Sequence, residues 1–208
     1  MSVIDRIRDT LSSLSGPLTR EDAPRWAAAR SLPELAELTA QWLEGRIASQ
    51  PGYYGEVDVD EDLAPGLTVT LIACNRAGFL TNSSQAGCLD EVTETGRWTQ
   101  LAAVTGFAGR KLAERLAAAV AADGRFRIEH GCMELLGPGI TVTWRNGRPY
   151  TRFGGRMHRT TLRNELYGGC DGLALVDVAW SQQVTVYDPE PGRNELWAWL
   201  RGAVEEAR

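Results

Sequence analysis

The dipeptide Asn146-Gly147 constrains the fold more than any other feature of this sequence. Both residue types tolerate positive φ angles, and together they form the tight two-residue turn that joins neighbouring antiparallel strands. Segments 140–144 and 150–153 flank this dipeptide, and the first of them alternates as a strand does. We therefore predict a β-hairpin, and with it antiparallel β-structure.

Amphipathic segments surround this hairpin. Apolar residues recur every three or four positions in segments that start after capping residues or end at glycine, which is typical of surface helices. We expect helices at 5–14, 19–30, 31–48, 64–77, 110–122, 157–166 and 195–206. Shorter runs predict further strands at 79–81, 98–107, 125–130, 173–180 and 183–187. The mixture has no regular βαβ repeat, which predicts an α+β fold: a mostly antiparallel sheet packed against several amphipathic helices.

Length and composition indicate a single domain. A chain of 208 residues, 43% of them hydrophobic, is long enough to bury a substantial core. We expect residues 19–208 to form one α+β domain. Residues 1–18 should form an N-terminal helical arm, because Ser15-Gly16-Pro17 interrupts the helix pattern between the two.

The sequence also predicts a cytoplasmic protein without a membrane partner. No apolar run reaches the roughly 20 residues of a membrane span, and acidic Asp5 stands where a secretory signal is basic and then apolar. The four cysteines are Cys74, Cys88, Cys132 and Cys170. They lack the spacing of a zinc site or a disulfide framework, so we expect reduced thiols. Lys111 is the only lysine, and this bias towards arginine indicates a GC-rich, actinobacterial source.

The densest group of hydrogen-bonding side chains lies between Asn75 and Gln85, where a predicted helix ends and the chain turns through Gly78. Polar loops of this kind are common at binding sites. We predict a polar pocket whose ligand-binding residues in this segment are Asn75, Arg76, Thr81, Ser84 and Gln85. The alternative is that Asn75 and Ser84 satisfy backbone groups of the turn and the helix end.

The same segment carries a resemblance to a known family. Its motif consists of Asn75-Arg76-Ala77-Gly78-Phe79-Leu80-Thr81, then Ser84-Gln85-Ala86-Gly87, Gln100 and Gly106-Phe107. With this motif the chain resembles an uncharacterised protein family found in streptomycetes and some of their phages. The resemblance extends from Trp26 through Trp42-Leu43-Glu44-Gly45 to the C-terminus. It implies a shared fold and allows a shared site, but it supplies no reaction, substrate or catalytic residue.

Positive charge is concentrated in the second half of the chain. Residues 1–100 contain eight basic and fifteen acidic residues (net −7), whereas residues 101–208 contain fourteen and twelve (net +2). Six arginines follow one another without an intervening acid, namely Arg145, Arg148, Arg152, Arg156, Arg159 and Arg163. On a helix, Arg156, Arg159 and Arg163 would share one face and bind phosphate or carboxylate. The alternative is that these arginines pair with the acidic loop 56–62 or are solvated.

Nucleophilic catalysis needs a base beside a thiol or hydroxyl, and the chain has two histidines, His130 and His158. His130 and Cys132 would point to the same side of an extended segment, so they are the candidate catalytic pair. The alternative for Cys132 is a buried structural role. Two histidines and scattered acids predict no metal site. The glycine pairs lack the spacing of nucleotide-binding loops, so we predict no cofactor.

These features favour a protein that binds or processes a small anionic ligand in a polar cleft, such as a nucleotide or a phosphate or carboxylate metabolite. An enzyme would need His130 or His158 within hydrogen-bond reach of a cysteine, serine or carboxylate in that cleft. The alternative is a non-enzymatic protein-interaction or regulatory factor, including a phage-related one. It would expose an apolar patch around Trp26, Trp42, Trp197 or Trp199. The net charge of −5 argues against nucleic acid as a partner.

Overall fold

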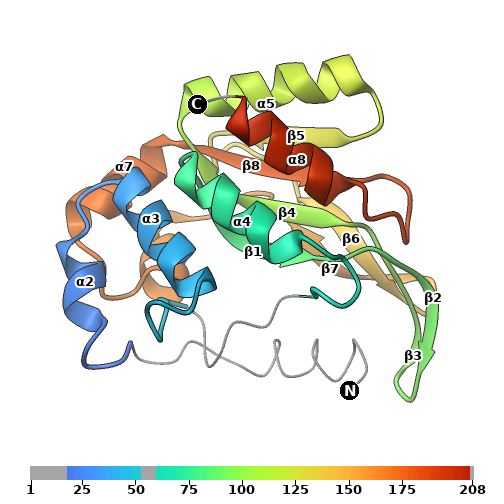
Figure 1. Cartoon of the computed structure of the whole chain (residues 1–208), viewed down its shortest axis with the longest axis horizontal. Coiled ribbons are helices and arrows are strands. Elements are labelled where there is room, and N and C mark those ends of the chain that lie inside the picture. The colour runs from blue at the N-terminus through green and yellow to red at the C-terminus, as the bar shows by residue number, and fades with distance from the viewer. Residues whose placement is uncertain (1–17, 53–59, 207–208) are drawn as a thin grey trace.

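The computed structural model describes residues 18–52 and 60–206 (Figure 1). The helices are α2 (Ala23–Ala28), α3 (Leu32–Leu43), α4 (Leu67–Arg76), α5 (Arg110–Asp123), α6 (Arg159–Thr161), the π-helical turn η1 (Leu162–Leu166), α7 (Gly172–Trp180) and α8 (Leu196–Glu205). The strands are β1 (Phe79–Gln85), β2 (Cys88–Thr93), β3 (Gly96–Gln100), β4 (Ala103–Ala108), β5 (Arg127–Gly131), β6 (Ile140–Arg145), β7 (Arg148–Phe153) and β8 (Gln182–Tyr187). Of the predicted N-terminal arm, only Leu18 belongs to the described residues. No helix within these ranges is both long and apolar enough to cross a bilayer.

The strands form two four-stranded sheets. The first has the order β1-β4-β8-β5, and the second has the order β2-β3-β6-β7. Every neighbouring pair is antiparallel. The predicted α+β fold, antiparallel strands packed against helices, is therefore confirmed.

The main core lies between the first sheet and its helices. Figure 1 shows α3, α4, α8 and α5 together on the near side of that sheet. The largest fully buried side chains of this core include Trp26, Trp197, Tyr167, Phe79 and Phe107. Complete burial of one large apolar side chain contributes about 1.5–3 kcal/mol to folding, so this layer supplies most of the hydrophobic stabilisation.

Capping residues set several helix ends where the sequence predicts them. The Ser31 hydroxyl accepts a hydrogen bond from the first turn of α3. Gly78 follows α4 with a φ angle of +87°, which is the predicted glycine stop. Helix α3 ends at Leu43 and not near Ala48, because Gly45 adopts a φ angle of +71° and turns the chain away.

The predicted hairpin is confirmed. Asn146 and Gly147 have φ angles of +51° and +73° and join β6 to β7. Strand β6 pairs on its other side with β3, so this hairpin forms one half of the second sheet.

The prediction of one strand over 98–107 is wrong, because this segment contributes to both sheets. It contains the end of β3 and most of β4, and Leu101 and Ala102 connect them. The Leu101 amide donates to the Val142 carbonyl at 2.9 Å, and the Ala102 carbonyl accepts from the Asp188 amide at 2.8 Å. Both strands are partly or wholly buried here, so the apolar pattern does not change where the chain changes sheet.

The prediction of a strand at 173–180 is also wrong, since this segment forms helix α7. The Asp171 carboxylate accepts a hydrogen bond from the Leu173 amide at 2.7 Å and caps the helix. The β-branched Val176 and Val178 suggest a strand, but the cap and the packing of one helix face against the core outweigh their preference.

Gly106 allows β1 and β4 to approach each other closely. A Cβ atom at this position would lie 2.8 Å from Thr81 Cα and closer still to the Leu80 carbonyl oxygen. We expect Gly106→Ala to lower the free energy of unfolding by about 3 kcal/mol or more, because backbone atoms cannot yield cheaply. Urea denaturation measures this loss. The matched variant is Gly202→Ala in α8, where the added methyl meets open space and should stabilise by up to about 1 kcal/mol. Equal stability of the two variants would contradict the strand register described.

Candidate functional site

Asn75 and Thr81, two predicted ligand-binding residues, are bonded to each other. The Asn75 side chain is 1% exposed. Its Nδ2 donates to the Leu71 carbonyl at 2.8 Å and to Thr81 Oγ1 at 2.7 Å, while its Oδ1 accepts from the Thr81 amide at 3.1 Å. This amide therefore ties the end of α4 to the start of β1.

Gln85 is similarly committed to internal contacts. Its Nε2 donates to the carbonyls of Leu101 and Val142 at 3.0 and 2.9 Å, and its Oε1 accepts from Thr143 Oγ1 at 3.0 Å. These partners belong to the connection between the sheets and to β6, so Gln85 on β1 joins the first sheet to the second. Ser84 beside it is half-buried and lies opposite Val104 in the first sheet.

The predicted basic residues do not form one helical row. Arg76 is exposed and pairs with Glu37 and Glu44 of the α3 segment. Arg156 precedes α6, whereas Arg159 starts it and Arg163 lies in η1. The prediction of one continuous α-helix over 157–166 is thus wrong. The segment consists of a three-residue helix capped by His158, followed by the π-helical turn.

The candidate catalytic residues lie at the end of β5. His130 Nδ1 is buried without a hydrogen-bond partner among the described residues. No hydrogen bond joins it to Cys132, which is half-buried, within that same part of the chain. His158 is exposed, and its Nδ1 lies 2.9 Å from Thr160 Oγ1. This geometry supplies no observed thiol–base contact, and the pair stays a prediction.

The tryptophans proposed for an interaction surface are not exposed. Trp26, Trp42 and Trp197 are buried, and Trp199 is half-buried against Phe126, with their ring centroids 4.7 Å apart. The protein-interaction hypothesis therefore loses the surface on which it was based.

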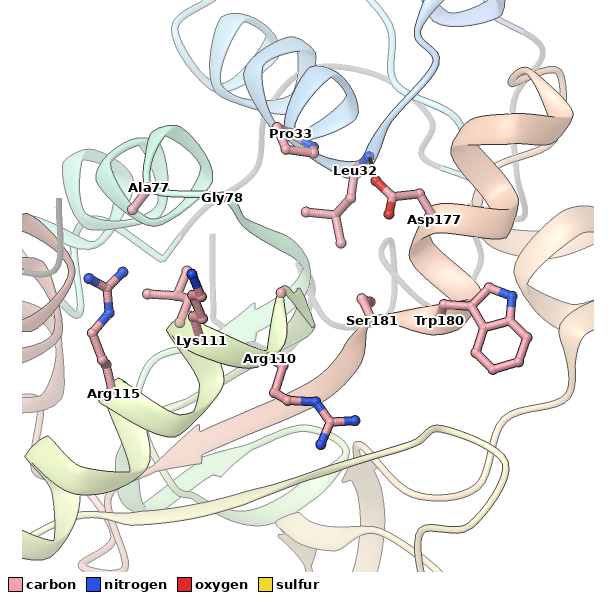
Figure 2. Close-up of a pocket in the computed structure, with 12 residues that line it drawn as sticks. Leu32, Pro33, Ala77, Gly78, Arg110, Lys111, Arg115, Asp177, Trp180 and Ser181 are labelled. Carbon is pink, nitrogen blue, oxygen red and sulfur yellow. Dashed lines mark hydrogen bonds between the residues drawn. The ribbon is translucent and has the colours of Figure 1, made fainter.

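A pocket of about 470 Å³ lies at one end of the first sheet. In that sheet Phe79, Ala108 and Gln182 lie side by side, where β1 begins, β4 ends and β8 begins. The helices adjoining these strand ends form the walls. The lining residues are Leu32, Pro33, Ala77, Gly78, Gly109, Arg110, Lys111, Leu112, Arg115, Asp177, Trp180 and Ser181 (Figure 2).

The first turn and a half of α5 makes one wall basic. Arg110, Lys111 and Arg115 are exposed, and no ion pair involves them within the described ranges. Figure 2 shows Arg115 extending towards Ala77, whereas Arg110 extends away from Leu32, Pro33 and Gly78. Lys111 and Arg115 are four residues apart on the helix, so their like charges repel.

The backbone of α5 adds to this positive potential. The amides of Leu112 and Ala113 donate to the Gly109 carbonyl, but those of Arg110 and Lys111 have no partner among the described residues. Gly109 provides no side-chain cap, and the first turn contains no acid. Helix N-termini carry partial positive charge and favour acids. Two bases at this position therefore concentrate positive charge, and the described structure contains no ion pair to either of them; the nearest acid along the helix is Glu114.

The opposite wall is largely apolar. It is formed by Leu32 and Pro33 at the start of α3 and by the end of α7, where the indole of Trp180 extends away from Leu32 and Lys111 (Figure 2). Asp177 is the one acidic residue among the described lining residues, and its carboxylate accepts a hydrogen bond from the Leu32 amide at 2.8 Å. It therefore caps α3 and leaves the bases of α5 unpaired.

These features define a class: an α+β domain of two antiparallel sheets with a pocket, basic on one wall and apolar on the other, at one end of the first sheet. The chain belongs to an uncharacterised family, because the family model described as a domain of unknown function (DUF6919) matches residues 21–207. The expectation of an uncharacterised family is confirmed at that level. A search of the curated proteins finds no match.

Sequence reasoning missed the residues that surround this pocket. Ala77 and Gly78 lie within the predicted polar segment, but neither was predicted to bind a ligand. The available signal was the start of α5, where Gly109 is followed by Arg110 and Lys111 and no acid compensates for them. Trp180 could not be assigned while its segment was interpreted as a strand.

If Gln85 joins the sheets, its loss should reduce stability whether or not a ligand is present. We expect Gln85→Leu to lower the free energy of unfolding by about 2–3 kcal/mol, because it leaves buried carbonyls and a hydroxyl without a partner. Urea denaturation is the measurement. Gln182→Leu is the matched control: the side chain is half-buried, and the change should stay within about 0.5 kcal/mol. If Gln85→Leu were as stable as the unaltered protein, the internal bonds of Gln85 would not be needed for folding, and Gln85 would be available for ligand contact.

Three thiols should be unreactive. Burial raises the pKa of Cys88 and of Cys170 to about 12, and it raises that of Cys74 further. At pH 8 a thiol with such a pKa is about one part in ten thousand thiolate. We expect iodoacetamide to modify Cys132 first, as followed by mass spectrometry, and all four cysteines after denaturation. His130→Gln should leave the rate at Cys132 unchanged, and a slower rate would support the predicted pair.

Proposed function

We propose that this protein binds a small anionic ligand in the pocket at the start of α5, which we call the α5 pocket. The observation that carries the proposal is the group of unpaired cations, Arg110, Lys111 and Arg115, beside two free backbone amides at the wall of a pocket of about 470 Å³. Pockets of this size accommodate small molecules. The proposal concerns binding and includes no reaction.

The chemistry of this wall suits phosphate or carboxylate groups. A helix N-terminus offers backbone N–H groups to an anion. The Lys111 ammonium adds a point charge, and the Arg115 guanidinium can bind two oxygens at once. A bound anion would also relieve the repulsion between these two side chains. The ligand class predicted from the sequence is thus retained, but its contacts move to α5.

The predicted site residues support this pocket indirectly. Asn75 and Thr81 hold the chain on both sides of Ala77 and Gly78, which form part of the wall. Arg159 reaches the rim, where its guanidinium lies 5.4 Å from the centroid of the Trp180 ring. The remaining predicted residues have no role in this proposal.

The charge distribution favours a small ligand over nucleic acid. The whole chain has a net charge of −5, so the basic wall of the α5 pocket is a local feature. Duplex binders usually present a broad basic surface that neutralises many phosphates. A compact anion needs one such cluster only.

Lys111 makes this proposal directly testable, because it is the only lysine in the chain. We expect at least one member of a panel of inorganic phosphate, sugar phosphates, nucleoside monophosphates and carboxylates to slow the acetylation of Lys111. The α-amino group serves as the internal reference in the mass spectrum. The same compound should raise the melting temperature, since a ligand at 100 times its Kd stabilises by about 2.7 kcal/mol.

Substitutions that remove one charge each test whether the basic wall of the α5 pocket binds the ligand. Lys111→Gln and Arg115→Gln should each weaken binding about tenfold, as expected for the loss of a charged hydrogen bond. Arg148→Gln on β7 of the second sheet removes the same type of exposed charge and should leave the affinity unchanged. Failure of every compound to protect Lys111, or equal binding by all three variants, would contradict the proposal.

A further inference from the structure

Helix α7 has an exposed apolar face. Leu173, Val176 and Trp180 are 55%, 53% and 74% exposed. Their spacing of three and four residues places them on one side of the helix. The Trp180 indole belongs to this side, because it extends away from Leu32 and Lys111 (Figure 2). We call these three residues the outer face of α7.

The composition of α7 indicates that this face is covered. The helix has the sequence Gly-Leu-Ala-Leu-Val-Asp-Val-Ala-Trp, so Asp177 is its only charged residue. The Asp177 carboxylate accepts a hydrogen bond from the Leu32 amide at 2.8 Å and is therefore committed to α3. A helix that is apolar on all sides is typical of a buried position. The outer face of α7 therefore calls for an apolar cover.

The chain itself supplies a segment with a matching pattern. Residues 1–17 lie outside the described residues, and their sequence predicts an amphipathic helix over 5–14. Read from its C-terminal end, the apolar stripe of this helix repeats the spacing of three and four residues found on the outer face of α7. Two helices with this spacing pack side by side along their apolar stripes. The stripe consists of Ile4, Ile7, Leu11 and Leu14.

The first described residue shows where this segment joins the domain. Leu18 is half-buried and packs against the main core. Its Cδ1 lies 3.7 Å from the position that a Cβ atom of Gly169 would occupy, and Gly169 is three residues before α7. Figure 1 shows α2, which follows Leu18, at the same end of the molecule as α7. Leu14 is four residues from Leu18, which span up to about 14 Å when extended, so the start of α7 lies within its reach.

We propose that the N-terminal segment packs as a helix along the outer face of α7 and antiparallel to it. The antiparallel direction follows from the position of Leu18, which brings the C-terminal end of the segment to the start of α7. A segment tethered at this point acts at a high effective concentration, which favours it over a separate partner. This docking requires no ligand in the α5 pocket. The three contacts pair Leu14 with Leu173, Leu11 with Val176 and Ile7 with Trp180.

Arg159 supports the Trp180 ring without covering it. The Arg159 guanidinium lies 5.4 Å from the ring centroid, and its Nε lies 3.2 Å from Glu134 Oε1. A cation–π contact of this kind favours one orientation of an exposed ring. Because Trp180 is still 74% exposed, most of its surface is available to an apolar residue such as Ile7.

Hydroxyl-radical footprinting of the full chain tests whether the outer face of α7 is covered, because side-chain oxidation is faster at exposed residues. We expect Ile7→Ser with Leu11→Ser to raise the oxidation rates of that face by about threefold or more, since the apolar stripe that holds the helix is lost. Arg6→Ser with Asp9→Ser is the matched control. These two positions lie on the opposite side of the predicted helix, the net charge is unchanged, and the rates should stay the same. Tyr150 on β7, which is 43% exposed, serves as the internal reference.

An engineered disulfide tests the direction and the register. In a Cys132→Ser background, which removes a half-buried thiol, Leu14→Cys with Leu173→Cys should form a disulfide within one chain under mild oxidation. Ile4→Cys with Leu173→Cys is the matched control, because Ile4 lies ten residues, or about 15 Å, further along the helix. We expect this pair to cross-link at least about tenfold more slowly, since a disulfide needs Cα atoms within about 7 Å of each other. Non-reducing electrophoresis and peptide mass mapping measure both pairs.

Three results would overturn the proposal. The first is unchanged oxidation of the outer face in the Ile7 and Leu11 variant, and the second is an equal rate of cross-linking by the two cysteine pairs. The third is a set of cross-links confined to dimers, which would assign the cover to a second copy of the chain. Circular dichroism checks that each variant is folded, and the cysteine pairs decide the question if the serine variant unfolds.

Discussion

The side-chain amide of Gln85 fixes the position of one sheet relative to the other, and the rest of the structure depends on that position. Buried polar side chains, namely Gln85, Gln100, Thr105, Thr143 and Thr185, accompany the small apolar cluster of Ala103, Val142 and Phe153 that joins the two sheets. Buried polar groups cost free energy unless each is paired. Gln85 satisfies two carbonyls and one hydroxyl on the connection and on β6, and Thr105 bonds to Thr185 across β4 and β8 at 2.9 Å. The hydrogen bonds of Gln85 therefore specify the arrangement of the sheets together with this apolar cluster.

The position of β4 in turn places the pocket. This strand is buried along its whole length, with β1 on one side and β8 on the other, and its last residue leads directly into α5. Two helix N-termini consequently face the same cavity. That of α3 is capped by Ser31 and Asp177, whereas that of α5 has neither a side-chain cap nor an acid. The positive end that remains free is the one that bears Arg110 and Lys111.

The features that the sequence predicted correctly are those with a local cause. Asn146-Gly147 forms its turn because of its own backbone preferences, and Gly78 ends α4 for the same reason. The prediction of one strand over 98–107 was wrong because residues on both sides of the connection are buried, so the apolar pattern of the sequence does not change where the chain passes from one sheet to the other. Helix α7 could have been recognised from Asp171, a good N-cap residue, had it been weighed against the valines that follow.

The candidate site was harder to predict because a polar side chain that bonds to protein looks the same in a sequence as one that bonds to a ligand. Asn75, Thr81 and Gln85 are rich in donors and acceptors, and the fold uses them internally. The lining residues of the α5 pocket, by contrast, come from four helices. The register of β1, β4 and β8 brings the ends of α4, α5 and α7 together, and the bond from the Leu32 amide to Asp177 joins α3 to α7.

The start of α5 and the end of α7 both depart from what stability alone would favour. Acids in place of Arg110 and Lys111 would interact with the helix dipole more favourably by about 0.3–1 kcal/mol each, and a polar residue in place of Trp180 would expose no indole. Either departure by itself would be unremarkable on a protein surface. The departure at the start of α5 is the more informative one, because it lies at the wall of a cavity, and residues that break local rules are typical of functional sites. An anionic ligand would compensate for this departure, since its charge would neutralise the bases of the α5 wall.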